Sequence, residues 1–350
     1  MDKDDLTALA AAKRPRLLKK SRKPASRPHV EQKKTLMKAA AIDRFGPPSV
    51  LKLHTVPVPE PGPGEVLIAL HAAGVGVWDA DIRGGWWPEG RPKFPLILGT
   101  DGAGTIAAMG SRVRRFRKND RVWAYEFINP KGGFYAEYVA VNSEHVGRVP
   151  PRLDLLQAGA AAVTGLTALQ GVADHLRVRP GETVLIYGAS GAVGTLAIQF
   201  AKSRGARVLG TATGRDAATL VRRLGAAGVI DARSKRGIEE LQALAPNGLD
   251  AVLAFAGGDG LERCLDLVRA GGRVAHPNGV EPEPKKRRNL KILSYDAVNG
   301  RREFDRLASA VEAAKLKVPI AAIYPLAQAA KAHERIMKGH VLGRIALRIR

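Results

Sequence analysis

The sequence TVLIYGASGAVGTLAIQFAKSRGA, residues 183–206, carries the strongest indication of fold in the chain. It opens with an apolar run at 184–187, which has the length and composition of a buried strand. Gly188, Gly191 and Gly194 follow at three-residue spacing, and a helical pattern of apolar residues comes after them. Another apolar run then predicts a second strand. The order strand, glycine turn, helix, strand is that of a dinucleotide-binding unit.

The glycines have a chemical reason in such a unit. One allows a tight turn, one lets the backbone approach a pyrophosphate, and one lets the helix pack close to the strand. The helix N-terminus offers free N–H groups and a partial positive charge to phosphates. The spacing is GxxGxxG rather than GxGxxG, and the alternative is a glycine-rich corner that serves packing only. The loop residues expected at a cofactor are Gly188, Ala189, Ser190, Gly191, Ala192, Val193 and Gly194.

Length and composition set limits on the fold and the compartment. The 350 residues suffice for two domains with cores of their own, and 45% of them are hydrophobic. The single cysteine, Cys264, excludes an internal disulfide framework and a zinc site made of several cysteines. No signal peptide and no apolar run approaching a membrane span are visible. We therefore expect a cytoplasmic protein without membrane contact.

The net charge of +23 is high, and part of it is local. Residues 1–35 carry eleven Lys or Arg against four Asp or Glu, among prolines and serines. This composition predicts a disordered basic tail. The tail is either an arm for nucleic acid or nuclear import, or a solubilising extension that makes weak non-specific contacts, which we favour. The remaining charge lacks the alternating aromatic residues of a base-stacking surface.

Two kinds of pattern divide the rest of the chain. From near Met37 to about residue 150, short strands alternate with Gly/Pro turns, which indicates a β-rich domain of barrel type. Its first strands are expected at 39–53 and 65–70. From 183 to 295, strands alternate with helices, as in a parallel, doubly wound sheet. Those strands are expected at 183–187, 208–213, 229–231, 251–255 and 273–276.

Ordered blocks spread along residues 36–350 resemble the medium-chain dehydrogenase/reductase superfamily, in its zinc-independent quinone oxidoreductase branch that contains zeta-crystallin. The blocks include GTDGAGTI from Gly99, GGFYAEY from Gly132, GLTA from Gly165, GASGAVG from Gly188 and HVLGR from His340. The resemblance implies an α/β protein with a GroES-like β-barrel domain and a Rossmann domain. It places a GroES-like catalytic domain at 36–158 and 297–350 and the nucleotide-binding domain at 159–296. It also implies a homodimer that pairs nucleotide domains.

The resemblance also shows what the site lacks. Zinc alcohol dehydrogenases of this superfamily have a cysteine where this chain has Gly76, and a His-Glu pair where it has Thr100 and Asp101. The lobe that holds a structural zinc is absent, and the eight histidines lack ligand spacing. We therefore expect no metal. Without a metal to polarise an isolated carbonyl, hydride transfer needs an acceptor that is already electrophilic, such as a quinone or an α,β-unsaturated carbonyl.

Two departures from the branch concern the substrate cleft. Gly76-Val77 stands where relatives carry Asn-Pro, and Asp81 stands where they often carry tyrosine. The candidate catalytic residues are Asp79, Asp81 and Tyr125, each of which is alternatively an ordinary polar loop or core-edge residue. Trp86 and Trp87 either form an apolar wall over the acceptor or pack under a loop. The basic loop 281–288 is expected to be mobile and to border the cleft.

The cofactor is expected to be NADPH. NAD-binding members place a carboxylate at the end of the second nucleotide-domain strand, where this chain has Ala212, followed by Thr213. Arg215 is available for a 2′-phosphate, with Arg222 and Arg223 as alternatives. By resemblance, Thr167 reaches the nicotinamide ribose or a phosphate; its alternative role is a helix cap. The residues expected to pass the nicotinamide are Phe255, Ala256 and Gly257.

Two classes of function follow. The first is an NADPH-dependent, zinc-independent oxidoreductase that transfers hydride to a quinone or an α,β-unsaturated carbonyl. The second is a non-catalytic, NADPH-responsive protein that binds nucleic acid, since a charge of +23 favours such a contact. An NADPH-oxidation assay over a panel of quinones and enones separates the two.

Overall fold

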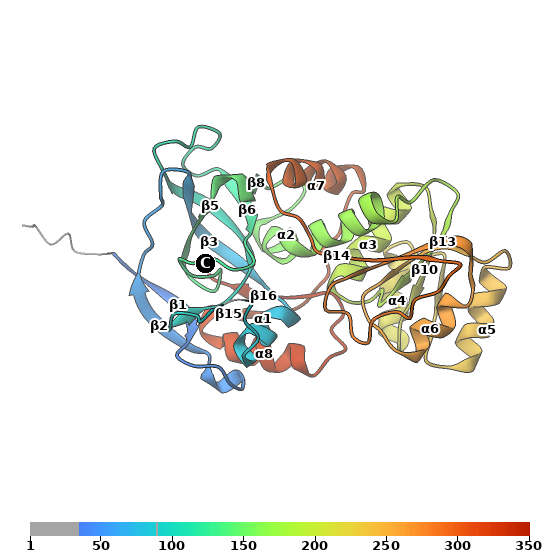
Figure 1. Ribbon diagram of the computed structural model, residues 1–350. Helices are drawn as coiled ribbons and strands as arrows, with labels where there is room; N and C mark the ends of the chain where they lie inside the picture. The colour runs from blue at the N-terminus through green and yellow to red at the C-terminus, as the bar shows by residue number, and fades with distance from the viewer. Residues whose placement is uncertain (1–34, 89) are drawn as a thin grey trace, which may run out of the picture. The chain divides into compact units, whose positions relative to one another are not determined.

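Two large sheets, built from different parts of the chain, organise the structure (Figure 1). This computed structural model describes residues 35–88 and 90–350. The prediction of a disordered basic tail at 1–35 therefore lies outside the described residues, except for Thr35.

The first large sheet is six-stranded, and every pair of neighbouring strands in it is parallel. Its order is β11-β10-β9-β12-β13-β14, which is the strand order of dinucleotide-binding sheets. The predicted doubly wound parallel sheet is thereby confirmed, with β14 as a strand that the sequence did not indicate. The strands are β9 (Thr183–Tyr187), β10 (Arg207–Thr211), β11 (Gly228–Ile230), β12 (Leu249–Ala254), β13 (Val268–Pro277) and β14 (Lys291–Tyr295).

Helices link these strands. The helix after β9 begins beyond its N-cap, Gly191, and its chain turns back at Gly205, whose φ of 81° suits glycine. Its apolar residues Leu196, Ile198 and Phe200 are buried, as the pattern predicted. The linking helices are α3 (Ala192–Ser203), α4 (Arg215–Arg223), α5 (Lys235–Leu244) and α6 (Asp259–Leu265).

The second large sheet joins the N-terminal part of the chain to its end. The last strand, β16 (Arg344–Arg348), pairs antiparallel with β3 (Glu65–Val75), so that Ala346 lies opposite Gly74. The GroES-like half therefore combines early and late segments, as the resemblance implied. The other strands of this sheet are β5 (Asp101–Met109), β6 (Arg121–Tyr125), β7 (Tyr138–Asn142), β8 (Val146–Arg148) and β15 (Ile320–Pro325).

The first strands form a small third sheet, and their bounds differ from the predicted ones. Residues 39–53 do not form one strand: β1 (Leu36–Ile42) ends early, and β2 (Lys52–Pro57) returns antiparallel to it. Gly46, Pro47 and Pro48 lie between them, and two prolines cannot donate ladder hydrogen bonds. The small sheet is completed by β4 (Leu96–Ile97). The strand expected at 65–70 extends further, as β3.

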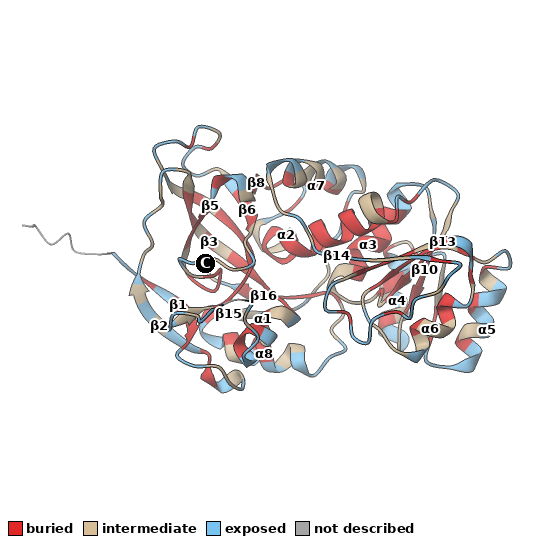
Figure 2. Cartoon of the chain, in the orientation of Figure 1, coloured by how far each residue is buried: buried red, intermediate tan, exposed pale blue. Residues whose placement is uncertain are grey.

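One apolar helix packs against elements of both halves. α2 (Leu155–Gln170) is capped by Asp154, whose carboxylate accepts from the Gln157 N–H at 2.7 Å. It packs against β3, β5 and α3, and Figure 2 shows it buried along most of its length. A π-helical turn, Gly171–His175, continues it. Residues 35–350 form one compact unit, so the domain boundaries at 158 and 296 stay a prediction.

Leu155–His175 also bears on membrane contact. By length and composition this stretch is apolar enough to cross a membrane, which the sequence reading did not register. However, 83% of its most apolar window is buried inside the protein, as in the core helix of a globular fold.

The remaining α-helices of the described residues are α1 (Val77–Gly84), α7 (Arg301–Ala313) and α8 (Ala329–Met337).

Candidate active site

A cleft of about 620 Å³ lies at the carboxyl ends of the parallel strands. It is lined by the glycine loop after β9, by the ends of β10, β11 and β12, and by residues before β16 and after β3. Crevices at this edge of a doubly wound sheet are where such folds bind ligands. The predicted cofactor residues among its lining are Gly188, Ser190, Gly191, Ala192, Val193, Gly194, Ala212, Thr213, Phe255 and Ala256.

The glycine loop has the close backbone approaches that a pyrophosphate cradle needs. Gly188 has a φ of 79°, and its N–H donates to the Thr211 hydroxyl at 2.8 Å. A Cβ on Gly194 would lie 2.3 Å from the Gly188 carbonyl oxygen, so only glycine lets α3 pack this close. Gly191 caps α3 without a side-chain bond, which leaves the first N–H groups of the helix available to an anion. The residues present therefore fit a dinucleotide phosphate.

The segment before β16 reaches the glycine loop. The Gly343 N–H donates to the Ser190 carbonyl at 2.9 Å, and Gly191 and Gly343 form an isolated parallel bridge. Gly343 has a φ of 98°, and a Cβ there would lie 2.3 Å from the Pro319 carbonyl oxygen. The block HVLGR, from His340, resembles the superfamily, but the sequence alone gave it no place in a site. Its place in the cleft follows from the sheet pairing of β16, which sequence spacing does not reveal.

The ends of β10 and β11 supply the residues that bear on the choice between NADH and NADPH. Ala212 and Thr213 line the cleft, but Arg215 begins α4 as an exposed residue outside the lining. A carboxylate is nonetheless present, since Asp231 from the neighbouring strand end lines the cleft 3.5 Å from the Thr213 hydroxyl. The end of β10 itself has Ala212, as the sequence analysis expected, and the carboxylate comes from the end of β11.

Asp231 is held by Arg233, another lining residue that the sequence analysis missed. The Arg233 Nε lies 3.3 Å from Asp231 Oδ1, and its backbone N–H donates to the same oxygen at 3.1 Å. Partial burial tends to raise the pKa of Asp231, but the hydrogen bonds and charge of Arg233 lower it below the ordinary value. The pair thus places an ionised carboxylate and a guanidinium at the same strand end.

The opposite wall of the cleft is built around Trp78. A Cβ at Gly76 would lie 2.3 Å from the Trp78 ring, so the indole occupies the space that a side chain at position 76 would need. The Trp78 Nε1–H donates to the Thr100 hydroxyl at 2.7 Å. Two of the three positions that correspond to zinc ligands in relatives are therefore joined through this ring. No cluster of three or more metal-binding side chains occurs among residues 35–88 and 90–350.

The third of those positions, Asp101, is engaged in a buried ion pair. Its Oδ1 accepts from the Arg344 guanidinium at 2.9 Å, and both residues are almost completely buried. The pKa of Asp101 is raised by burial, and the charge of Arg344 opposes this rise. Arg344 lines the cleft, and its guanidinium lies 5.0 Å from the centre of the Trp78 ring. The ion pair fixes a positive charge beside the indole.

The three candidate catalytic residues lie outside the lining of this cleft. Asp79 is fully buried in the barrel core, where its Oδ2 accepts from the Gly76 N–H at 2.8 Å and from the Tyr135 hydroxyl at 3.1 Å. Asp81 lies on the exposed side of α1. Burial raises the pKa of Tyr125 far above its ordinary value, and its carbonyl accepts from Asn299. Their catalytic roles therefore stay a prediction.

Five further candidates also have other surroundings, and one of them, Ala189, is fully buried in the hydrophobic core. The Thr167 hydroxyl donates to the Val163 carbonyl of its own helix at 2.9 Å. A Cβ on Gly257 would lie 1.9 Å from the Pro282 carbonyl oxygen, so this glycine admits a neighbouring loop. Trp86 is half-exposed and pairs with the Phe127 ring, whereas Trp87 packs on the barrel core.

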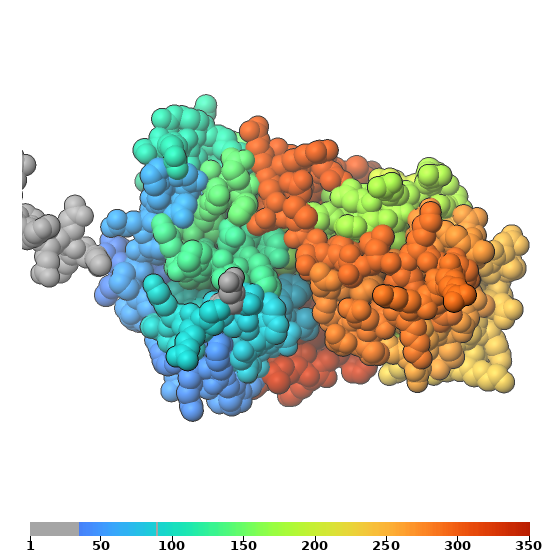
Figure 3. Space-filling model, in the orientation of Figure 1, coloured from blue at the N-terminus to red at the C-terminus, as the bar shows by residue number. Residues whose placement is uncertain are grey.

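The loop at 281–288 is anchored to α6. Arg287 forms ion pairs with Glu262, at 2.9 Å, and with Asp266, and the Lys285 N–H donates to Glu262. The segment linking β13 to β14, in orange, lies on the face seen in Figure 3. No residue of this loop lines the cleft, in contrast to the expectation that it borders it.

Comparison with known proteins agrees with this geometry. Residues 62–151 match the family described as alcohol dehydrogenase GroES-like domain, and residues 224–347 match the zinc-binding dehydrogenase family. Human quinone oxidoreductase is 33% identical over 316 residues, which span 87% of this chain and 95% of that protein. The chain belongs to the medium-chain dehydrogenase/reductase superfamily and is quinone oxidoreductase-like.

Solved structures of this superfamily superpose well. One described as an NAD-dependent alcohol dehydrogenase has a TM-score of 0.83 at 30% identity and covers 90% of this chain and 100% of its own. Escherichia coli quinone oxidoreductase complexed with NADPH has a TM-score of 0.78 at 25% identity, with 89% and 100% covered. The GroES-like and Rossmann folds predicted from the sequence are confirmed. With its glycine loop, this superfamily member is an NAD(P)-dependent oxidoreductase.

Proposed function

We propose that the protein is an NADPH-dependent, zinc-independent oxidoreductase that transfers hydride to a quinone or an α,β-unsaturated carbonyl. The observation that supports this most directly is the cleft itself, with a pyrophosphate cradle on one wall and the Trp78 indole on the other. The relatives named quinone oxidoreductase support the same class of acceptor.

NADPH is favoured by the charges on the cleft. Arg233 offers a guanidinium at the strand end where the adenosine ribose would lie, and a guanidinium pairs well with a phosphate. Arg344 also lines the cleft, but its charge is paired with the buried Asp101, so it adds little to the attraction for a phosphate. The NADPH complex of a relative supports this choice, whereas another relative is named NAD-dependent. The Asp231–Arg233 pair is therefore the feature that decides between the two cofactors.

Zinc independence is supported by the donor set. The positions that correspond to zinc ligands hold Gly76, Thr100 and Asp101, and the last two are engaged with Trp78 and Arg344. A bound nicotinamide would supply hydride. The chain's own residues would orient the acceptor against the Trp78 ring and exclude water. An acceptor whose conjugation spreads the incoming charge suits such a site.

The test is a steady-state assay of NADPH oxidation over quinones, enones, and simple ketones, together with elemental analysis of the active preparation. We expect turnover of quinones or enones, much slower turnover of ketones, and less than one zinc per ten chains. One tightly held zinc per chain that is lost together with activity would contradict zinc independence. No turnover of any acceptor, with NADPH still bound, would favour the non-catalytic nucleic-acid-binding alternative.

A further inference from the structure

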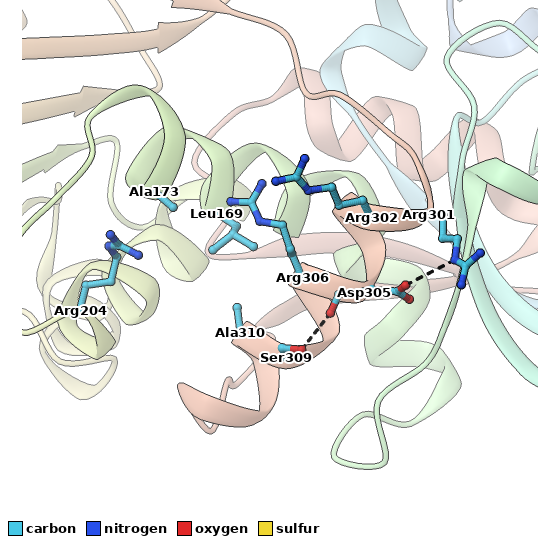
Figure 4. Close-up of a pocket in the computed structure, with 9 residues that line it drawn as sticks. All are labelled: Leu169, Ala173, Arg204, Arg301, Arg302, Asp305, Arg306, Ser309 and Ala310. Carbon is cyan, nitrogen blue, oxygen red and sulfur yellow. Dashed lines mark hydrogen bonds and ion pairs between the residues drawn. The ribbon is translucent and has the colours of Figure 1, made fainter.

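A second concavity, separate from the cofactor cleft, lies between α7, the end of α2 with its π-helical turn, and the end of α3. Its volume is about 570 Å³, within the range of small-molecule sites. Leu169, Ala173 and Ala310 supply its apolar floor. Its polar rim, which Figure 4 shows in sticks, contains Asp305, Ser309 and four arginines: Arg204, Arg301, Arg302 and Arg306.

The charges of this groove are only partly compensated. Arg306 is held by Asp174 of the π-helical turn through two bonds, of 2.5 and 3.1 Å. Arg301 points away from the groove toward Asp305, at 3.9 Å (Figure 4). Within residues 35–88 and 90–350, the Arg302 side chain has no hydrogen-bond or ion-pair partner, and Arg204 bonds only the Val178 carbonyl. Two guanidinium charges therefore lack a carboxylate.

The helix spacing concentrates this charge over the apolar floor. Arg302 and Arg306 are four residues apart, so they extend from the same face of α7, and Figure 4 shows both above Leu169. Like charges at this spacing destabilise a helix, and Asp174 balances only one of them. A π-helical turn is an uncommon element that occurs often at functional sites, and here it brings both Asp174 and Ala173 to the groove.

We propose that this groove binds a small amphipathic anion, namely a phosphate monoester with an aliphatic body. The phosphate pairs with Arg302 beside Arg306, and the aliphatic body lies on Leu169, Ala173 and Ala310. Guanidinium groups suit a phosphate because their N–H groups match its oxygens in pairs. The apolar floor distinguishes this ligand from free inorganic phosphate, which has no surface to place there.

The experiment measures binding of octyl phosphate to the full chain by isothermal titration calorimetry, with neither nicotinamide cofactor nor acceptor present. Octanol and inorganic phosphate serve as probes that lack the head or the aliphatic body. We expect saturable binding of octyl phosphate at one site, at least tenfold tighter than that of either fragment. Octyl phosphate that binds no tighter than inorganic phosphate would overturn the proposal, because the floor would then contribute nothing.

Variants locate the site. Arg302→Gln removes the uncompensated charge and should weaken octyl phosphate about tenfold or more, as for the loss of a charge-assisted hydrogen bond. Ser309→Glu places a carboxylate on the exposed rim and should weaken it similarly. Arg236→Gln removes another exposed arginine, on α5 and outside the groove, and should leave the affinity within twofold. Equal losses in Arg302→Gln and Arg236→Gln would show non-specific attraction and overturn the site.

Discussion

At the scale of single residues, Asp79 shows how a buried group takes part in a chain of hydrogen bonds. The Arg83 Nε donates to His333 Nδ1 at 3.2 Å, and His333 Nε2 lies 3.3 Å from the Tyr135 hydroxyl, which bonds Asp79. Burial and then the charge of Arg83 lower the pKa of His333 to about 3, so its ring is neutral. With Nδ1 accepting, Nε2 carries the proton and donates to Tyr135. The chain ties α1 to α8, both of which adjoin the cleft.

Asp79 predicts a pH dependence of stability. Burial raises its pKa to about 7, the Gly76 N–H, Arg344 and Tyr135 oppose this rise, and Asp101 adds to it. The folded state therefore holds a proton that the unfolded state loses near pH 4, so stability falls as pH rises from about 4 to 7. Asp79→Asn keeps an acceptor for Gly76 without the charge. We expect the variant to be more stable than wild type at pH 8 by about 1–4 kcal/mol, and the gap to close toward pH 5.

Urea unfolding of both proteins at pH 5, 6, 7 and 8 checks this expectation. Asp216→Asn, at an exposed position on α4, is the matched control and should follow wild type at every pH. A constant gap between Asp79→Asn and wild type across the series would mean that Asp79 does not titrate in this range.

Substitution of Arg233 tests whether the protein prefers NADPH or NADH. Arg233→Ala removes the guanidinium and leaves the Asp231 carboxylate facing the 2′-phosphate, so NADPH should bind about tenfold or more weakly. NADH should bind as well as before or better, because a carboxylate at this strand end accepts from ribose hydroxyls. Arg215→Ala, which removes the residue that the sequence suggested, should change neither affinity. Fluorescence titration of both cofactors decides the matter, and the reverse outcome would assign the phosphate to Arg215.

At the scale of elements, local patterns predicted the nucleotide sheet well. β9 spans Thr183–Tyr187 as expected, because the length of its apolar run and the glycine after it favour a buried strand over a helix. Residues 39–53 failed as one strand, since alternation continued on both sides of a turn formed around Gly46 and its two prolines. β14 was missed because its pattern of half-buried and exposed residues is weak, although its partner, β13, is the preceding strand.

Some residues of the cleft could be predicted from local sequence, and others are brought there only by the tertiary structure. The glycine loop was found because its residues are contiguous and its spacing has a chemical reason. Asp231, Arg233 and Arg344 were not assigned to the site, since the first two follow β11 and the third begins β16, all far from the glycine loop in sequence. Trp78 was also missed: nothing in the sequence indicates that its ring fills the space above Gly76. Side-chain packing of this kind depends on the fold as a whole.

At the scale of the whole molecule, the charged residues at concave sites suit small molecules, whereas the basic residues 1–35 suit a polymer such as RNA. The described part of the chain holds the cofactor cleft, whose Arg233 and Arg344 are paired with Asp231 and Asp101, and the arginine groove, where Arg302 has no such partner. Residues 1–35 carry a net +7 of the total +23 in a tenth of the sequence. Cytoplasmic location and pairing of two copies through their nucleotide sheets remain predictions.

Deletion of residues 1–34 should leave cofactor binding unchanged but weaken binding of nucleic acid. The described residues that line the cofactor cleft lie between Val75 and Ile345, so the melting temperature and NADPH affinity should stay within error of the full chain. Affinity for a twenty-nucleotide single-stranded RNA should fall severalfold, and the slope of log affinity against log salt should become shallower, because fewer counterions are released. Fluorescence anisotropy between 50 and 200 mM salt measures both. If RNA affinity is unchanged by the deletion but falls in Arg302→Gln, the folded surface carries the contact instead, and the tail has no part in it.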